Sequence, residues 1–393
     1  MNTRRRASAL WSLALLAVLA GCSDDPSSTG GDGGAGATGT GGSGAAGGMM
    51  GTGGMGGMAD DAYEQAIRAA SWVEISGAPS VSGGAKNDDI FFFDDDHGFL
   101  ASGNDHAIYE TQDGGASWTT AFSATGAYFR AVTFTDAMTG FAGNIGAGLA
   151  PSINDPNPIY GTSDGGATWS PVTISGEAPA GICNFTSAPD GTLFGVGRAN
   201  GPTHLATSSD GGATWSSVSL SSWLSMAIDA RFTSADEGLV VGMGPGSKCT
   251  VIRTSDGGAT FDTVFSSTAS GSLCWKINFP TDDVGYVAIQ QTTLGPSAFA
   301  KTTDGGATWQ ELPLPDMGAY PALAAGFITA DIGWMVSEDP LEPAYRTYDG
   351  GATWEEDPSL KAPINRFRFV DVDTAYAVGA KVYKLQLDYT PSN

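Results

Sequence analysis

A short motif that recurs six times constrains this chain more than any other feature. The copy at Thr162–Trp169 reads Thr-Ser-Asp-Gly-Gly-Ala-Thr-Trp. The six copies contain the aspartates Asp113, Asp164, Asp210, Asp256, Asp304 and Asp349. Each copy ends on a large aromatic residue, in order Trp118, Trp169, Trp215, Phe261, Trp309 and Trp354. A repeat of roughly 45 to 50 residues predicts a propeller or a solenoid, because one unit cannot bury its apolar face without its neighbours.

Each repeat also has the pattern of four β-strands. In the second repeat we expect strands at Phe129–Phe134, Phe141–Gly143, Ile159–Thr162 and Trp169–Ile174. These segments are rich in β-branched and aromatic residues, and glycine-rich stretches separate them, which favours strands over helices. The first strand ends on a phenylalanine, and a short turn leads to the glycine that opens the second strand. The chain has seven such first strands and six motifs.

The two ends of the chain together supply the strand that the seventh repeat lacks. Asn365–Leu387 contains three predicted strands and no motif, whereas Trp72–Ile75 resembles the end of a repeat without its beginning. If Trp72–Ile75 pairs with Lys381–Leu385, the ring closes and loses its open edge. The sequence therefore predicts an all-β fold over residues 71–390. We expect a seven-bladed β-propeller of four-stranded blades, in which an N-terminal strand completes the last blade.

The Asp-Gly-Gly segment of each motif predicts a tight hairpin. Its glycines permit a positive φ, and the aspartate carboxylate can accept backbone N–H groups. We therefore interpret the motifs as structural. Because strands alternate in direction, the motifs share one face, and loops of variable length such as Gly143–Pro158 lie on the opposite face. Binding residues tend to lie on such loops, so we expect a functional site on the face opposite the motifs.

The N-terminus has the pattern of an export signal. Arg4, Arg5 and Arg6 precede an apolar run at Ala9–Ala20, which is short for a membrane-spanning helix. The next residues, Leu19-Ala20-Gly21-Cys22, resemble the lipobox of bacterial lipoproteins. That resemblance implies a signal peptide over residues 1–21, lipidation of Cys22 and attachment to an envelope membrane. The alternative is an ordinary secretory signal that is cut nearby.

A tether and a short helix are expected between this signal and the propeller. Residues 22–59 are mostly small and polar, which predicts a flexible tether. Residues 60–70 have the composition of a helix. Ser23 after Cys22 favours the outer membrane under the sorting rule of enteric bacteria. We therefore expect a lipid-anchored protein of the cell envelope, at the outer membrane.

The charge of the chain limits its partners. The formal net charge is −24, and such an acidic surface repels phosphate backbones and anionic lipid head groups. We therefore expect no nucleic-acid partner, and contact with a membrane only through the lipid anchor. We also expect a monomer without a cofactor.

Four basic residues lie in first strands, which we expect to line the central channel as the inner strands of the blades. Counted from the phenylalanine at the end of each strand, their side chains point to the same face. They are Arg231, Lys276, Arg366 and Arg368, and Asp229 has the same phase. Together they can line the central channel and bind an anionic or carboxylate-bearing ligand. The alternative is that they form ion pairs between blades, with Asp229 neutralising an arginine.

Three cysteines remain if Cys22 is acylated. Cys183, Cys249 and Cys274 all lie near strand starts on the loop-rich face, and an exported protein can oxidise two of them. Cys249 and Cys274 belong to neighbouring blades and are the favoured pair, which leaves Cys183 free. No CxxC spacing or nearby histidine accompanies them, so we expect no metal site.

The six motifs resemble the Asp-box, or BNR, motif of sialidases, some glucanases and sortilin-like receptors. The wider pattern, which runs from Arg130–Asp136 through Gly140-Phe141 to the motif, is similar to the propellers of photosystem II assembly and stability factors and their bacterial relatives. This similarity covers residues 70–387. It implies a non-catalytic scaffold that binds an envelope protein or peptide. The alternative is a glycan-binding or glycan-cleaving protein of the sialidase or glycoside hydrolase kind.

The sequence assigns no catalytic residue. The Arg-Ile-Pro start typical of sialidases and the Gly-x-Ser-x-Gly elbow of serine hydrolases are both missing. The three histidines, His97, His106 and His204, have no metal or nucleophile spacing. The sequence therefore leans against an enzyme and leaves the ligand open.

Overall fold

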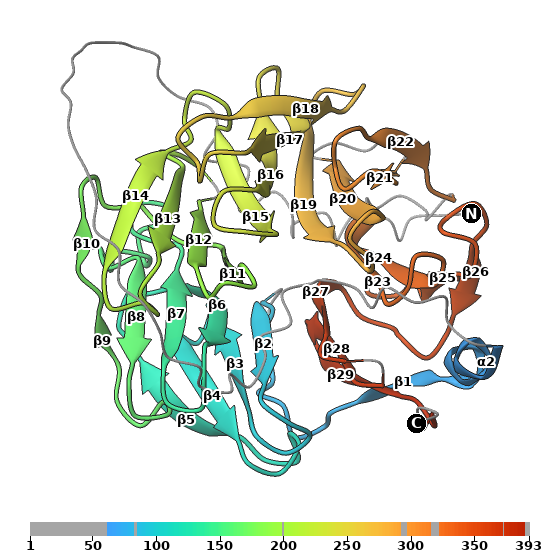
Figure 1. The fold of residues 1–393 in the computed structure, drawn as a ribbon. Helices are drawn as coiled ribbons and strands as arrows, with labels where there is room; N and C mark the ends of the chain where they lie inside the picture. Colours follow the sequence, from blue (N-terminus) through green and yellow to red (C-terminus); the bar gives the residue numbers. More distant parts are fainter. Residues whose placement is uncertain are drawn as a thin grey trace, which may run out of the picture.

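Seven radial sheets surround a central channel in the computed structural model (Figure 1). The structure describes residues 61–81, 85–198, 200–291, 297–315, 322–371 and 373–389. The predicted signal peptide, Cys22 and the predicted tether lie outside these ranges. The fold is the predicted seven-bladed β-propeller of antiparallel four-stranded blades.

The first three blades follow one another along the chain. Blade 1 contains β2 (Asp89–Phe92), β3 (Gly98–Ser102), β4 (Ala107–Thr111) and β5 (Thr119–Ser123). Blade 2 contains β6 (Phe129–Phe134), β7 (Gly140–Asn144), β8 (Ile159–Thr162) and β9 (Ser170–Pro171). Blade 3 contains β11 (Asn184–Ser187), β12 (Leu193–Gly197), β13 (His204–Ser208) and β14 (Trp215–Ser219).

The next three blades repeat this order. Blade 4 contains β15 (Met226–Phe232), β16 (Gly238–Gly244), β17 (Lys248–Thr254) and β18 (Asp262–Ser266). Blade 5 contains β19 (Ser272–Asn278), β20 (Gly285–Gln291), β21 (Ala298–Thr302) and β22 (Gln310–Pro313). Blade 6 contains β23 (Ala322–Phe327), β24 (Gly333–Ser337), β25 (Ala344–Thr347) and β26 (Glu355–Asp357).

Blade 7 is built from both ends of the chain, as the sequence predicts. It contains β27 (Ile364–Phe369), β28 (Ala375–Gly379), β29 (Val382–Gln386) and the N-terminal strand β1 (Ser71–Glu74). β1 pairs antiparallel with β29, with Trp72 opposite Leu385. The Trp72 ring is buried and packs edge-on against Trp334 of blade 6, with ring centroids 5.3 Å apart. The closing strand therefore also fills the interface between the last two blades.

Helix α2 (Asp61–Ala69) precedes the closing strand and lies at the outer rim beside β1 and β26 (Figure 1). Tyr63 and Ile67 are buried, and the Arg68 guanidinium lies 3.7 Å from the ring centre of Tyr348 in blade 6. Within the described ranges, no helix combines the length and apolarity needed to cross a bilayer.

The outer strand of blade 2 differs from the prediction. It ends at Pro171, although Val172 N still donates to Ile159 O of the neighbouring strand at 3.0 Å. Ile174, the expected last residue of this strand, instead forms β10 (Ile174–Ser175), which pairs parallel with β14 of blade 3. Blade 3 therefore has a fifth strand that comes from the end of blade 2.

All six Asp-Gly-Gly motifs adopt the same hairpin. In each, the aspartate accepts the backbone N–H of the residue four positions later at 2.8 to 2.9 Å, and its hydroxyl at 2.5 to 2.6 Å. The hydroxyl and backbone hydrogen bonds from Thr308 lower the pKa of Asp304 to about 2. The carboxylate therefore stabilises the turn by accepting these hydrogen bonds.

The second glycine of each motif and the aromatic residue that follows join neighbouring blades. Gly166 has φ +91°, and an added Cβ there would lie 2.8 Å from the Phe99 ring of blade 1. The Trp169 ring packs at 5.9 Å from both Phe122 of blade 1 and Phe134 of blade 2. The motif therefore acts as a spacer between blades, as the structural interpretation expects.

We expect Trp72→Ala to lower the free energy of unfolding by about 3 to 5 kcal/mol, because it removes a buried ring between two blades. Val73→Ala on the same strand serves as the control. Val73 is 46% exposed, and we expect a change within about 0.5 kcal/mol. Urea unfolding of the two variants measures both values. Equal losses would contradict the role of Trp72 in closing the ring.

Candidate functional site

Each inner strand contributes one residue at an equivalent height in the central channel. Every inner strand is followed by a turn, such as the one closed by Thr135 N donating to Thr139 O at 2.9 Å. In six blades the equivalent residue is the third before the strand's last position, and in blade 5, whose inner strand ends at Asn278, it is the third before Phe279. These residues, which we call the channel ring, are Asp89, Ala131, Asn184, Asp229, Lys276, Ala324 and Arg366.

Asp89 holds the two arginines of blade 7. Arg368 donates to its carboxylate in a bidentate pair, with Nε to Oδ1 at 2.8 Å and Nη2 to Oδ2 at 2.7 Å. Arg366 Nε lies 3.4 Å from the same Oδ1, and Val132 N of blade 2 donates to Oδ2 at 3.3 Å. Burial raises the pKa of Asp89, but Arg366 and Arg368 more than offset this, so its pKa lies below the ordinary value. Asp89 is therefore a carboxylate at neutral pH.

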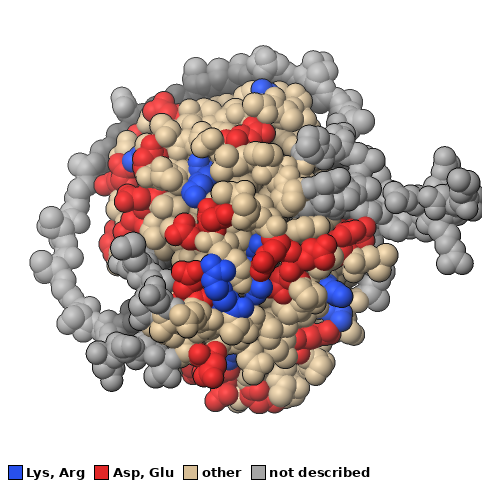
Figure 2. All heavy atoms as spheres, turned by 90° about the vertical axis from the view of Figure 1, so that its right-hand side faces the viewer, with Lys and Arg blue, Asp and Glu red and all other residues tan. Residues whose placement is uncertain are grey.

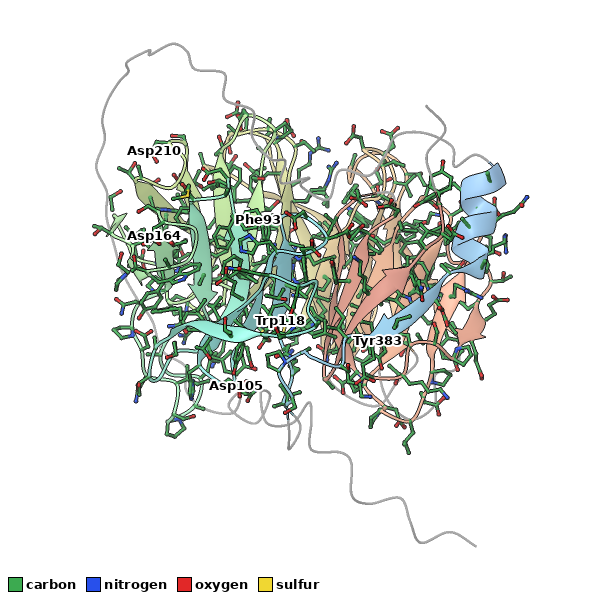
Figure 3. All side chains as sticks on the ribbon, turned by 90° about the horizontal axis from the view of Figure 1, so that it is seen from below. Phe93, Asp105, Trp118, Asp164, Asp210 and Tyr383 are labelled. Atoms are coloured by element: carbon green, nitrogen blue, oxygen red, sulfur yellow. A yellow bond between two sulfur atoms is a disulfide. The ribbon has the colours of Figure 1, made fainter. Side chains whose placement is uncertain are left out.

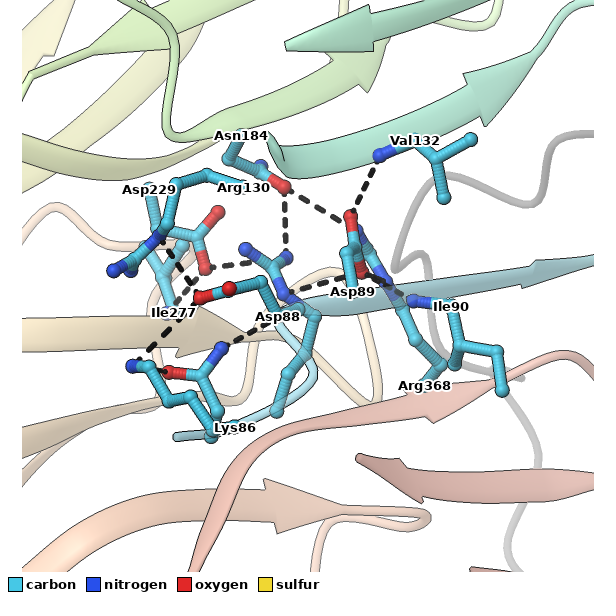
Figure 4. Close-up of polar contacts among 12 residues, drawn as sticks. Lys86, Asp88, Asp89, Ile90, Arg130, Val132, Asn184, Asp229, Ile277 and Arg368 are labelled. Atoms are coloured by element: carbon cyan, nitrogen blue, oxygen red, sulfur yellow. Dashed lines mark hydrogen bonds and ion pairs between the residues drawn. The ribbon is translucent and has the colours of Figure 1, made fainter. Parts of the chain in front are cut away.

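Arg366 connects the ring across the channel. Its Nη1 donates to Asn184 Oδ1 of blade 3 at 2.7 Å and lies 3.8 Å from Asp229 Oδ2 of blade 4. Figure 4 shows Asp89, Asn184 and Asp229 converging on the channel from separate blades. Among the described residues, Nε and Nη2 of Arg366 find no hydrogen-bond acceptor. Nε still lies in the longer ion pair with Asp89, so Nη2 is the nitrogen of Arg366 that lacks a partner of either kind among the described residues.

Lys276 is the fourth charged member of the ring. Its side chain is 4% exposed, and its Nζ has no hydrogen-bond partner in the part of the chain that the structure describes. Burial lowers the pKa of Lys276 well below its ordinary value, and Arg366 lowers it further, while Asp229 opposes the shift. An amine in this state is costly to leave unpartnered, which favours a ligand that supplies an acceptor.

A second polar layer lies beside the ring, towards the starts of the inner strands. Arg130 Nε lies 3.4 Å from Asp88 Oδ1, and Lys86 Nζ donates to Asn365 Oδ1 at 2.7 Å. The Trp275 ring faces the cations of this layer, with its centre 4.9 Å from Lys86 Nζ and 5.1 Å from Arg130 Cζ. Burial lowers the pKa of Lys86 to about 7, and Arg130 adds to the shift.

The channel cluster carries more cations than carboxylates. Ring and second layer together contain five basic residues against three acidic ones: Lys86, Arg130, Lys276, Arg366 and Arg368 against Asp88, Asp89 and Asp229. The outer surface is acidic by contrast. Figure 2 shows acidic side chains spread over the side of the molecule that carries α2, with basic ones in a few small groups. An anion therefore meets its positive field inside the channel.

A cavity of about 110 Å³ has the ring at its inner end. Lys276, Arg366, Arg368, Asn184 and Asp229 all line it. The other lining residues belong mostly to the later halves of the inner strands, including the turn residue Val370 at its rim. The volume accommodates several water molecules or one small polar group.

This cavity extends towards the motif face, not towards the loop-rich face that the sequence favoured. The motifs and the turns after the inner strands are hydrogen-bonded, as Gly165 N is to Met138 O at 2.9 Å. Asp210 of a motif and Asp105 of a loop on the other face lie near opposite edges of the disc in Figure 3. On the loop-rich side of the channel ring lies the second polar layer, with Trp275, whose members Asp88, Arg130 and Trp275 are buried.

The other predicted site residues lie outside the cavity. Arg231 has the expected phase, but it donates to Asp282 of blade 5 at 3.0 Å and stacks 4.3 Å over the Phe279 ring. It follows the ion-pair alternative and is not among the residues that line the cavity.

The favoured cysteine pair forms a disulfide. Cys249 and Cys274 are bonded, with their Cα atoms 4.4 Å apart, and Cys183 is free and buried. In the ranges that the structure describes, no group of three or more His, Cys, Asp or Glu side chains is placed to hold a metal ion.

Sequence reasoning missed half of the cluster. Asp89 is easily overlooked because Phe91, Phe92 and Phe93 follow one another, and an alignment on Phe93 puts Asp89 out of phase, whereas the strand ends at Phe92. The signal was present, since Phe92 precedes Gly98 by the same interval that separates Phe134 from Gly140. Asn184 was missed because the inner strand of blade 3 ends on Ser187, whereas the inner strand of blade 1 ends on Phe92. The phenylalanine used to align the strands is therefore absent from blade 3.

A β-bulge hid Arg130, whereas Lys86 and Asp88 precede β2 and lie outside the strand pattern. The register shifts at Arg130 in β6 and at Trp275 and Lys276 in β19. A bulge places one extra residue on the strand and re-aims its side chain, which a strict two-residue alternation does not predict. Arg130 therefore points into the channel although its phase differs from that of Lys276.

The arrangement is suited to binding an anion. Lys276 and Arg366 both line the cavity, and within the described ranges each has buried cationic N–H groups without a hydrogen-bond acceptor. Charge-assisted hydrogen bonds from such donors are the strong ones for a carboxylate or another oxyanion. Acid catalysis is not favoured, because the pKa of Asp89 lies below the ordinary value.

Comparison with solved structures gives matches over most of the chain. YCF48 from Cyanidioschyzon merolae is 17% identical, with a TM-score of 0.59, over 81% of this chain and 98% of that chain. A structure of YCF48 bound to D1 peptide is also 17% identical, with a TM-score of 0.59, over 81% and 97%. The GH74 xyloglucanase from Xanthomonas campestris is 14% identical, with a TM-score of 0.56, over 80% of this chain and 53% of that chain.

These matches define the class of the fold. At such identities they show a seven-bladed propeller, and they include a peptide-binding protein and a glycoside hydrolase. No protein-family model and no curated protein matches the chain. The choice of function therefore depends on the site.

We expect Asp89→Asn to cost about 3 to 5 kcal/mol of unfolding free energy, because two arginines in the channel lose their shared carboxylate. Asp282→Asn is the matched control. Its carboxylate also accepts from an arginine of a neighbouring blade, but its side chain is 88% exposed, so we expect a loss below about 1 kcal/mol. Chemical unfolding of both variants measures the difference. Losses of the same size would contradict the account of Asp89.

Proposed function

We propose that this chain is a lipid-anchored β-propeller of a bacterial cell envelope that acts as a non-catalytic binding or assembly scaffold for a protein or peptide partner. The observation that carries the proposal is the cationic floor of the channel cavity. Lys276 and Arg366 line this cavity and have N–H groups without acceptors among the residues that the structure describes, within a protein whose formal net charge is −24.

The cavity favours one group of a larger partner over a whole small molecule. Its volume of about 110 Å³ accommodates little more than a carboxylate and a few water molecules. A side-chain or terminal carboxylate can enter it while the rest of the partner lies on the motif face. YCF48 bound to D1 peptide supports this proposal, because it is a propeller of the same fold that binds a peptide.

The charges of the ring favour binding over glycan cleavage. A glycoside hydrolase needs one carboxylic acid that stays protonated near neutral pH and a second carboxylate. The pKa of Asp89 is held below its ordinary value by Arg366 and Arg368, and Asp229 accepts two backbone N–H groups beside Arg366. The environment of Asp89 therefore does not favour a protonated acid.

Charge reversal inside the cavity tests the proposal. Lys276→Glu places a carboxylate beside Arg366, where it occupies the site from within. We expect the full chain carrying this change to lose the envelope protein that the unmodified chain captures. Arg253→Glu is the control, because Arg253 precedes a motif on the same face and is not among the residues that line the cavity.

Two results would contradict the proposed scaffold. One is capture of the same proteins by the unmodified chain and by Lys276→Glu. The other is turnover in a panel of fluorogenic glycosides and sialosides that is lost in Asp229→Asn, which would favour the glycan-cleaving alternative.

The anchor is tested separately by growing cells with a palmitate analogue. We expect label on the mature chain and no label on Cys22→Ala, because the proposed thioether forms at that thiol. An unlabelled mature protein, or label that survives Cys22→Ala, would contradict the lipid anchor. Sucrose-gradient separation of the two membranes places the labelled protein, and we expect it in the outer-membrane fraction.

A further inference from the structure

We propose that a carboxylate enters the channel cavity together with one proton, and that Lys276 accepts this proton as the ligand binds. The inference rests on the proposed function, since it concerns the same site, and it adds how that site is regulated. It makes the propeller a pH-dependent receptor whose affinity is set by a single buried amine.

The surroundings of Lys276 explain why its amine lacks a counter-charge in the empty site. Arg366 of β27 and Arg130 of β6 lie nearby and are both cationic. Asp229 of β15 and Asp89 of β2 oppose them, but each carboxylate is shared with Arg366. The Trp275 ring, with its centre 5.4 Å from Nζ, faces the amine from its own strand.

The second layer does not neutralise Lys276 either. Lys86 is itself basic and donates to Asn365, while Asp88 lies 3.4 Å from Arg130 and 3.8 Å from Lys86. Asp88, Asp89 and Asp229 therefore each have an arginine partner already, and Glu338, whose charge acts on Lys86, accepts a hydrogen bond from Gln290. An ammonium at Lys276 would add an unbalanced charge to a buried site, which is unfavourable.

A bound carboxylate changes this balance. Its negative charge lies against Arg366 and Lys276, so an ammonium at Lys276 gains a partner and becomes favourable. The step is R–COO⁻ plus H⁺ plus the neutral lysine amine, giving R–COO⁻ against the lysine ammonium. The proton comes from solvent, no covalent bond to the ligand forms, and the total charge of the site is unchanged.

Linkage fixes the sign of the pH dependence. The pKa of Lys276 is already lowered in the empty site, and a bound carboxylate raises it. Between these two pKa values, binding takes up a proton, and affinity falls by about tenfold for each unit rise in pH. Below and above this window the affinity is independent of pH. A carboxylate ligand is itself ionised throughout, so the dependence belongs to the protein.

Calorimetry with acetate tests the inference on the purified full chain. Acetate is titrated at several pH values from about 6 to 10, each in two buffers that differ in ionisation enthalpy, so that the difference in heat counts the protons taken up. We expect uptake that approaches one proton per acetate within this range. We expect Lys276→Met to bind acetate more weakly and without proton uptake.

Lys86→Met is the matched control. Lys86 is the other buried lysine of the cluster, and burial lowers its pKa to about 7, but it is not among the residues that line the cavity. We expect this variant to keep the proton uptake. Uptake that disappears in Lys86→Met and persists in Lys276→Met would overturn the assignment to Lys276.

The outcomes separate the two proposals. If the unmodified chain binds no acetate at any pH, the carboxylate site of the proposed function fails. If it binds acetate with no proton uptake across the range, the site stands and the coupling is overturned. The chain has only seven lysines, so ¹³C-labelled lysine in the unmodified protein gives a second readout that does not depend on a folded variant. One buried lysine should gain a proton on addition of acetate at constant pH.

Discussion

The carboxylate of Asp89 is the contact on which both the ring and its site depend. It lies at the start of blade 1 and binds both arginines of blade 7, so it joins the first blade to the last where the chain closes. It also accepts Val132 N of blade 2. The same interaction that secures closure therefore fixes Arg366 and Arg368 at the cavity. Structure and function share one ion-pair cluster.

The repeat divides its residues between two roles. At the motif, selection of the same Asp-Gly-Gly hairpin in six blades keeps the spacing between blades uniform, and Gly166 shows why no larger residue fits. At the channel ring, the seven equivalent positions are occupied by five residue types, with alanine at Ala131 and Ala324 and polar residues elsewhere. A uniform frame thus allows an asymmetric site at its centre.

The fold could be predicted from the sequence because its signals are local and repeated. The motif count, the strand pattern and the orphan strand at Trp72 led to seven blades and to the pairing of β1 with β29. The site was predicted only in part, since Lys276, Arg366 and Arg368 follow from alternation. Arg130 does not follow from alternation, because it lies in a β-bulge. Asp89 does not follow when its strand is aligned on Phe93, because the strand ends at Phe92. The cavity opens towards the motif face because of the packing around Trp275 on the other side of the channel. The local sequence pattern does not predict this packing.

The central claim is that the channel ring binds a carboxylate. Two crystal structures of the full chain test it most directly, one grown with acetate and one grown without any carboxylate in the buffer. The account predicts acetate oxygens within hydrogen-bond distance of Lys276 Nζ and Arg366 Nη2, with Asp89 and Arg368 unmoved. The same water positions in both crystals would contradict it.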